Sequence, residues 1–207
     1  MIAQVPVIAH FVENCFFYVD DTTKHGFIID PGAQAEKLLG MIREKGWIIE
    51  KILLTHGHFD HIGAVNEIRS ALKIPVLAYK SDDDYLRDPE WNLSPSFGLS
   101  IIIENTESIT DGQIICLDAD PAFSLKVIYT PGHTTDSVIY YSERDRAAFV
   151  GDTIFKDSIG NYQLPGGNFA AIQKSIMERI FTLPDDTVLY SGHTEQTTVG
   201  TEKRKYL

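Results

Sequence analysis

Residues 55–64 read THGHFDHIGA and place three histidines and one aspartate within six positions, directly after the apolar run KILL of residues 51–54. Four ionisable side chains this close together would repel or desolvate one another unless a bound cation held them. Neutral imidazole and carboxylate groups are the ligands that zinc and iron accept from proteins. The stretch therefore predicts a metal site at the end of a buried strand.

Three further stretches repeat this pattern of an apolar strand, a turn and a ligand-type side chain. They contain His133 in TPGHT, Asp152 in FVGDT and His193 in YSGHT. Each stretch is a weak signal by itself, since a polar residue after a strand is common. Strand ends at one edge of a sheet lie close together, however, so we expect these side chains to converge with the first stretch.

The number of ligand-type side chains indicates two metal ions. Five histidines and two carboxylates make seven, whereas a single ion takes about four to six ligands. His56 and His58 are two positions apart and can reach one ion, while Asp60 and His61 point to a second place. The remaining histidines, His10 and His25, lie among strand or turn residues and are not predicted ligands.

The order of the expected elements indicates a sheet covered by helices. Residues 14–30 form two apolar runs around a polar turn, which predicts a hairpin. Further strands are expected in the ranges 51–54, 74–79, 113–117, 123–129, 137–142, 147–152 and 187–193. Helices are expected over 33–46, 62–73 and 168–183, the last with Asn168 as N-cap. The long, turn-rich segment 81–98 is expected to have a functional role.

Composition favours one soluble domain over residues 1–207. The chain has 43 % hydrophobic residues and a formal net charge of −11, so nucleic acid and anionic membrane surfaces are not expected partners. Cys15 and Cys116 each lie alone in an apolar run, which favours buried thiols in a reducing compartment. The N-terminus shows no signal-peptide pattern and no apolar run reaches the length of a membrane span. We therefore expect a cytoplasmic protein.

The motifs THGHFDH, TPGHT, GDT and SGH, in this order, resemble the metallo-β-lactamase superfamily, whose first motif is H-x-H-x-D-H. The resemblance covers nearly the whole chain. It implies an α/β fold, a four-layer αβ/βα sandwich with the metal site at one edge. It also implies the distribution of ligands: His56, His58 and His133 for one ion, Asp60, His61 and His193 for the other, and Asp152 bridging both.

Within the superfamily, the stretch GDTIFKDSIGNYQLPGGN of residues 151–168 is similar to the short glyoxalase II-like hydrolases of bacteria. These are thioester hydrolases without the C-terminal helical domain that holds glutathione in full-length glyoxalase II. The commonest zinc β-lactamases instead carry a cysteine at the position of Asp152, and RNA-processing members are longer. This chain departs from the pattern at two places, Asn161-Tyr162-Gln163 and Thr194-Glu195. Neither departure changes a metal ligand, but both leave open which thiol carries the acyl group.

The resemblance implies a hydrolase of thioesters such as S-(2-hydroxyacyl)glutathione, with two divalent metal ions, zinc first and iron or manganese as alternatives. A water held between two cations loses a proton near neutral pH, and the resulting hydroxide attacks the thioester carbonyl. Asp60 is predicted both to bind metal and to accept a hydrogen bond from this hydroxide. The alternative is an enzyme like the mononuclear iron persulfide dioxygenases, which use the same residues. A non-catalytic binding domain is disfavoured by the complete ligand set.

Residues outside the ligand set are predicted to hold the substrate or to position the ligands. Lys156, Asn161 and Tyr162 follow the bridging aspartate and are the candidate substrate contacts, and the partner expected is a small-molecule thioester. Trp91 and Phe97 from the long middle segment are candidate pocket walls, with packing inside that segment as the alternative. Asp30, which follows the strand FIID, is either a residue that orients the His56–His61 loop or a turn residue before Pro31-Gly32. The sequence leaves the oligomeric state open.

Overall fold

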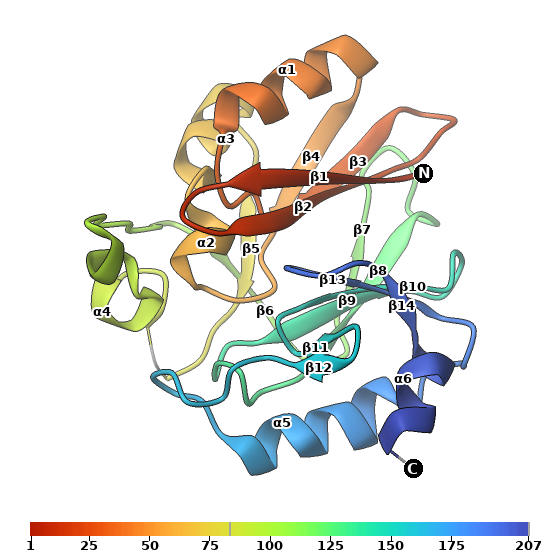
Figure 1. Ribbon diagram of the computed structural model, residues 1–207. Coiled ribbons are helices and arrows are strands. Elements are labelled where there is room, and N and C mark those ends of the chain that lie inside the picture. The colour runs from red at the N-terminus through yellow and green to blue at the C-terminus, as the bar shows by residue number, and fades with distance from the viewer. Residues whose placement is uncertain (83, 207) are drawn as a thin grey trace.

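The computed structural model describes residues 1–82 and 84–206 and contains two six-stranded sheets that face each other (Figure 1). The first sheet has the strand order β1-β2-β3-β4-β5-β6. Its strands are β1 (Ile2–Ile8), β2 (Val12–Val19), β3 (His25–Ile29), β4 (Ile48–Leu53), β5 (Val76–Tyr79) and β6 (Glu107–Ile109). β1, β2 and β3 pair antiparallel, whereas β3 to β6 pair in parallel.

The second sheet has the order β14-β13-β10-β9-β8-β7 and is antiparallel except where β10 pairs in parallel with β13. Its strands are β7 (Ile114–Cys116), β8 (Ser124–Tyr129), β9 (Val138–Ser142), β10 (Ala147–Gly151), β13 (Val188–Ser191) and β14 (Thr197–Thr198). A separate small sheet pairs β11 (Ile154–Phe155) with β12 (Ser158–Ile159).

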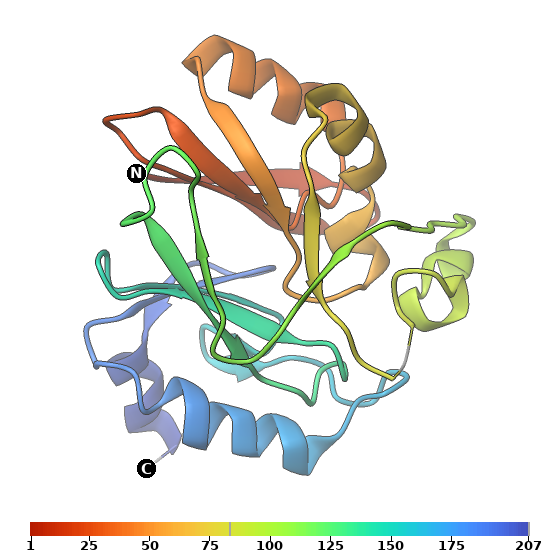
Figure 2. The same ribbon diagram turned by 180° about the vertical axis from the view of Figure 1, so that it is seen from behind.

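Helices cover the outer face of each sheet (Figures 1 and 2). On the first sheet these are α1 (Ala35–Lys45), the short α2 (Phe59–Ile62) and α3 (Val65–Leu72). On the second they are α5 (Phe169–Ser175), which continues as the π-helix η2 (Ile176–Ile180), and α6 (Val199–Tyr206). The resulting order of helix, sheet, sheet and helix confirms the predicted α/β sandwich.

Side-chain alternation along β2 explains how three apolar layers form. Cys15 and Phe17 face the cluster under α1 and α3, whereas Phe16 and Tyr18 face the cluster between the two sheets. Successive side chains of a strand point to opposite faces, so a strand with both faces covered is apolar throughout. A third cluster, which includes Ile172, lies between the second sheet and its helices.

Most predicted elements are present, and their ends follow the expected capping chemistry. The 14–30 hairpin forms as β2 and β3. Gly46 ends α1 with a φ of 64°, a left-handed conformation that glycine adopts without strain. Asn168 caps α5, because its side chain accepts a hydrogen bond from the Ala171 backbone N–H.

The middle segment differs from the expected irregular loop. It contains two short helical turns, α4 (Pro89–Asn92) and the 3-10 helix η1 (Ser94–Phe97). The Asp88 side chain accepts from the Glu90 backbone N–H, and Pro89 occupies the first turn, where its missing N–H costs nothing. Figure 1 shows α4 at the left, on the same side of the molecule as α2. No helix in the described part of the chain is both long and apolar enough to span a bilayer.

Candidate metal centre

Loops after four strands bring the predicted ligands together. His56 and His58 follow β4, His133 follows β8, Asp152 follows β10 and His193 follows β13. Asp60 and His61 lie on α2, directly after the first two histidines. Six of these seven side chains are buried and His193 is partly exposed. Both sheets therefore contribute to one cluster.

His56, His58 and His133 form the first set. The Nδ1 atom of His58 lies 3.2 Å from His56 Nε2 and 3.0 Å from His133 Nε2. The three side chains offer nitrogen atoms that all lie within 4.8 Å of one another. This spacing is that of three ligand atoms around a common centre.

Asp60, His61 and His193 form the second set. His193 Nε2 lies 3.4 Å from His61 Nε2 and 3.3 Å from Asp60 Oδ2. Asp152 lies between the two sets: its Oδ1 is 3.4 Å from His61 Nε2, and its Oδ2 is 3.3 Å from His193 Nε2 and 3.7 Å from His133 Nε2. One carboxylate thus reaches both sets, as a bridging ligand must.

The outer ring nitrogens of three histidines fix their tautomers. His61 Nδ1 lies 3.0 Å from Asp30 Oδ2, His133 Nδ1 lies 2.8 Å from the Asn161 carbonyl oxygen, and His193 Nδ1 lies 2.8 Å from the Val12 carbonyl oxygen. Carbonyl and carboxylate oxygens only accept, so each Nδ1–H donates. In a neutral ring, Nε2 then presents its lone pair to the centre, which is the arrangement of a metal-binding histidine.

The inner atoms fit a divalent metal ion. The Nε2 lone pairs of His61 and His193 face one another at 3.4 Å and repel unless a cation lies between them. Asp152 Oδ1 is also buried with no hydrogen-bond partner in the described structure. An unsatisfied buried carboxylate oxygen is costly, and a metal ion would satisfy it.

The two sets differ in charge. Burial lowers the pKa of His58 to about 3 and lowers the pKa of His56 and His133 as well, so the first set consists of neutral imidazoles. At His193 burial also opposes protonation, but Asp152 and Asp60 outweigh it and raise the pKa to about 10. The carboxylates of the second set therefore favour a positive charge at this position, whether a proton or a metal ion carries it.

Asp30 lies behind the second set and contacts the loop that it was predicted to orient. Its carboxylate accepts hydrogen bonds from the Thr55 backbone N–H at 2.7 Å, the Thr55 hydroxyl at 2.5 Å and His61 Nδ1 at 3.0 Å. It thus joins the start of the THGHFDH stretch to one of its candidate ligands. The orienting role itself stays a prediction.

Asn14 on β2 is a site residue that the sequence reasoning missed. Its side-chain amide donates to the carbonyl oxygens of Ser191 and Thr194, both at 3.0 Å, and its backbone N–H donates to the Gly192 carbonyl at 2.7 Å. These bonds hold the turn that carries His193 against the first sheet. The sequence does contain a signal for this role: Asn14 lies within an apolar strand, and a buried side-chain amide needs hydrogen-bond partners.

Replacing Asn14 by Ala is expected to weaken zinc binding about 10- to 100-fold, the range for partners that orient metal ligands. The turn around His193 loses two hydrogen bonds, so His193 is less well placed. Competition with a chromogenic chelator measures the affinity. The matched control is Asn66→Ala, since Asn66 also donates its amide to a backbone carbonyl, that of Ile102, and lies on α3. Equal affinities for the two variants would contradict the assigned role.

A pocket of about 560 Å³ opens over the cluster. The described residues that line it are Phe11, His58, Phe59, Asp60, Leu93, Ser96, Phe97, His133, Asp152, Phe155, Asn161, Leu164 and His193. Asn161 and Phe97 therefore lie where the sequence suggested. Lys156, Tyr162 and Trp91 do not line it: Lys156 pairs with Glu195 at 2.6 Å, and the other two rings pack on Phe169 and Tyr85.

Comparisons with known proteins agree with this geometry. A family model described as "Metallo-beta-lactamase superfamily" matches residues 10–193. The probable metallo-hydrolase YqgX of Bacillus subtilis is 37 % identical over 92 % of this chain and 89 % of its own length. The hydroxyacylglutathione hydrolase GloC of Haemophilus influenzae is 32 % identical over 97 % of this chain and 93 % of its own.

Solved structures show the same architecture. The structure titled BLEG-1 B3 metallo-beta-lactamase superposes with a TM-score of 0.91 at 34 % identity, covering 99 % of this chain and 97 % of that one. TTHA1623, solved in a di-iron-bound form, superposes with a TM-score of 0.84 at 33 % identity, covering 97 % of both chains.

Proposed function

The chain belongs to the metallo-beta-lactamase superfamily, and from this premise we propose that it is a metal-dependent hydrolase of thioesters such as S-(2-hydroxyacyl)glutathione. Two divalent ions per chain are proposed, one held by His56, His58 and His133 and the other by Asp60, His61 and His193, with Asp152 shared. The di-iron form of TTHA1623 supports the proposal of two ions per chain. Iron is for this reason proposed as a possible native metal together with zinc and manganese. We also propose a cytoplasmic enzyme that acts on small molecules, and the net charge of −11 supports the absence of nucleic-acid and anionic-membrane partners.

One observation carries the choice of thioesters. Every acid or base among the described residues that line the pocket belongs to the proposed ligand set, so none is left to protonate a leaving group. A thiol with a pKa near 8.5 leaves as the thiolate without such help. An alkoxide or an amine leaving group needs a proton in the transition state. The site therefore suits carbon–sulfur bond hydrolysis best.

The bound ions would supply Lewis acidity and lower the pKa of a coordinated water. The chain's own residues orient the groups around that water. Asp30 and the carbonyl oxygens of Val12 and Asn161 keep three imidazoles in the Nε2-inward tautomer. With the ions bound, Asp60 would accept a hydrogen bond from the coordinated water, and the apolar side chains that line the pocket would exclude bulk water, which would strengthen these interactions.

A β-lactam is the second substrate class that a comparison favours, since the structure titled as a B3 metallo-beta-lactamase is 34 % identical to this chain. The amide nitrogen released from a β-lactam must gain a proton, and the pocket lining offers no separate donor among its described residues. We therefore expect β-lactam hydrolysis to be slower than thioester hydrolysis. Assaying both classes on one zinc-loaded preparation tests the order.

Metal loading is expected to approach two equivalents per chain after reconstitution with zinc, iron or manganese, and chelation is expected to abolish thioester hydrolysis. The expectation follows from two ligand sets that share Asp152. Elemental analysis with an activity assay at each loading measures both quantities. A ceiling of one ion whatever metal is supplied, with oxygen uptake in the presence of a persulfide, would instead establish the mononuclear dioxygenase alternative.

A further inference from the structure

Three aromatic rings from separate segments form one wall of the pocket, here called the phenylalanine wall: Phe11, Phe59 and Phe97. Phe59 and Phe97 are stacked with ring centroids 4.3 Å apart, and Phe11 meets Phe97 edge-on at 5.4 Å. Phe59 directly follows His58, so the wall begins at the metal centre. The rings hold one another in place, which makes the wall a preformed apolar surface.

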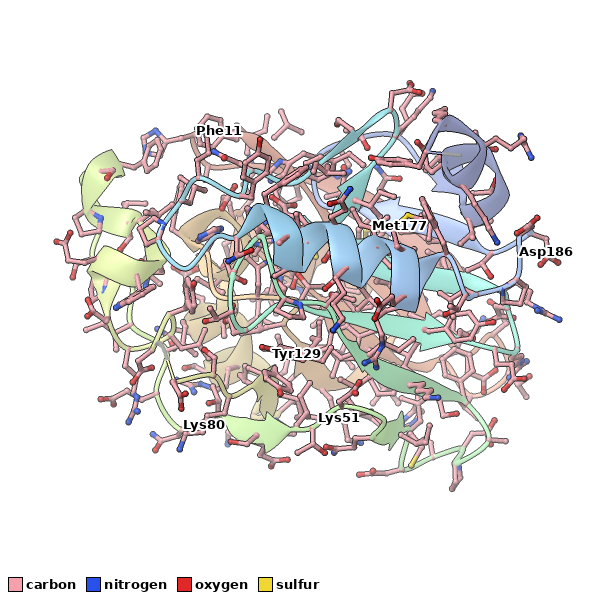
Figure 3. All side chains as sticks on the ribbon, turned by 90° about the horizontal axis from the view of Figure 1, so that it is seen from below. Phe11, Lys51, Lys80, Tyr129, Met177 and Asp186 are labelled. Carbon is pink, nitrogen blue, oxygen red and sulfur yellow. The ribbon has the colours of Figure 1, made fainter. Side chains whose placement is uncertain are left out.

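The wall extends from the buried centre to the surface. Phe59 is 3 % exposed, whereas Phe11, in the turn between β1 and β2, is 49 % exposed. Figure 3 shows Phe11 at the periphery, in the half of the molecule that carries α4. Leu93 and Phe97 come from the middle segment, so one role of that segment is to complete this wall. Because Phe11 both lines the pocket and is half exposed, a ligand that enters the pocket can contact it.

Apart from the metal centre, the described residues that line the pocket offer no Lys or Arg side chain to the carboxylates of an anionic substrate. Lys156, on the loop after Asp152, is bound to Glu195 at 2.6 Å instead. Glutathione carries two carboxylates, which proteins usually hold with Arg or Lys side chains. The net charge of −11 also repels an anionic thioester at long range.

Building on the thioester hydrolase function proposed above, we infer that the preferred substrates are neutral thioesters with an apolar acyl group, which packs on the phenylalanine wall. Water cleaves the carbon–sulfur bond and yields a carboxylate, a thiol and one proton. Phe155 and Leu164 also line the pocket, so apolar surface continues beyond the phenylalanine wall. The acyl group is the specificity determinant, because its carbonyl must lie at the metal centre beside Phe59.

The experiment compares four thioesters on the zinc-loaded enzyme: hexanoyl and lactoyl groups, each joined to glutathione and to N-acetylcysteamine, a neutral thiol. Each additional methylene on an apolar wall gains transition-state binding, so kcat/KM for hexanoyl-N-acetylcysteamine is expected to exceed that for lactoylglutathione by at least about tenfold. Calorimetry with the non-hydrolysable thioether analogue of each acyl chain measures binding without turnover. The hexyl analogue is expected to bind more tightly.

Phe11→Ala tests the wall without disturbing the core, since this ring is half exposed. It is expected to lower kcat/KM for the hexanoyl thioesters about fivefold or more and to change the lactoyl thioesters less than about twofold. Phe169→Ala is the matched control, because Phe169 is 50 % exposed and lies on α5 outside the pocket lining. Phe97→Ala is expected to show a larger acyl-selective loss.

The possible outcomes separate this inference from the function on which it depends. Acyl-selective losses in Phe11→Ala and Phe97→Ala, with none in Phe169→Ala, would establish the wall as the acyl site. A preference for lactoylglutathione would overturn the inference and leave thioester hydrolysis intact. Equal losses on hexanoyl and lactoyl substrates would also overturn it. Failure to hydrolyse any of the four thioesters would reject the proposed function and the inference together.

Discussion

Asp152→Ala is expected to lower kcat/KM for thioester hydrolysis by at least about a thousandfold, roughly 4 kcal/mol of transition-state stabilisation. The carboxylate lies 3.3–3.7 Å from ring nitrogens of both histidine sets, so its removal takes a ligand from both proposed ions at once. It also removes the negative charge that balances His61 and His193. Metal content should fall at both positions rather than at one.

Elemental analysis and an activity assay at saturating zinc measure these effects. Two variants serve as controls. Asp157→Ala removes a carboxylate only five positions away that pairs with Lys205 at the surface, and His25→Ala removes an imidazole that pairs with Glu50 at 2.6 Å. Both should keep nearly full activity and metal content. If His25→Ala lost as much activity as Asp152→Ala, the assignment of ligand and non-ligand side chains would be wrong.

The architecture was predictable because its signals are local. Each of three elements follows from neighbouring residues alone. The helical spacing of apolar residues in 33–46 predicts α1, the polar turn inside 14–30 predicts the β2–β3 hairpin, and the Asn168 cap predicts the start of α5. The same holds for the convergence of His56, His133 and His193, because each lies in the loop that follows a strand. Loops that leave the same edge of two packed sheets lie close together in space.

Contacts between distant segments were not predictable from local patterns. Asn14 and Val12 hold the turn around His193 across about 180 residues of chain, with sequence separations of 180 and 181. Lys156 was predicted to contact the substrate, but its side chain pairs with Glu195, 39 positions later in the chain. Pairing of this kind depends on register and tertiary packing, which a single sequence does not display. The substrate side of the site was for this reason harder to infer than the metal side.

Gly192→Ala is expected to reduce kcat/KM about a hundredfold although no ligand is changed, since a displacement of about 1 Å at a reacting centre has this effect. A Cβ atom on Gly192 would lie 2.5 Å from Asp152 Oδ1 and 2.6 Å from His61 Cε1, inside van der Waals contact with two proposed ligands. The backbone cannot retreat, because the Gly192 N–H donates to the Gly151 carbonyl and its own carbonyl accepts from Asn14. The ligands must therefore move.

Gly40→Ala is the matched control for this substitution. Gly40 lies within α1, and the nearest atom to its added Cβ, outside the neighbouring residues and the helix backbone, is Arg43 Nη2 at 3.9 Å. That variant should keep full activity and gain about 0.5–1 kcal/mol in unfolding free energy, since alanine favours the helix. Zinc affinity and thermal unfolding of both variants separate the effects. A shared metal centre requires Asp152 and His61 to keep their present positions. Normal zinc affinity and normal activity in Gly192→Ala would therefore contradict the proposed centre.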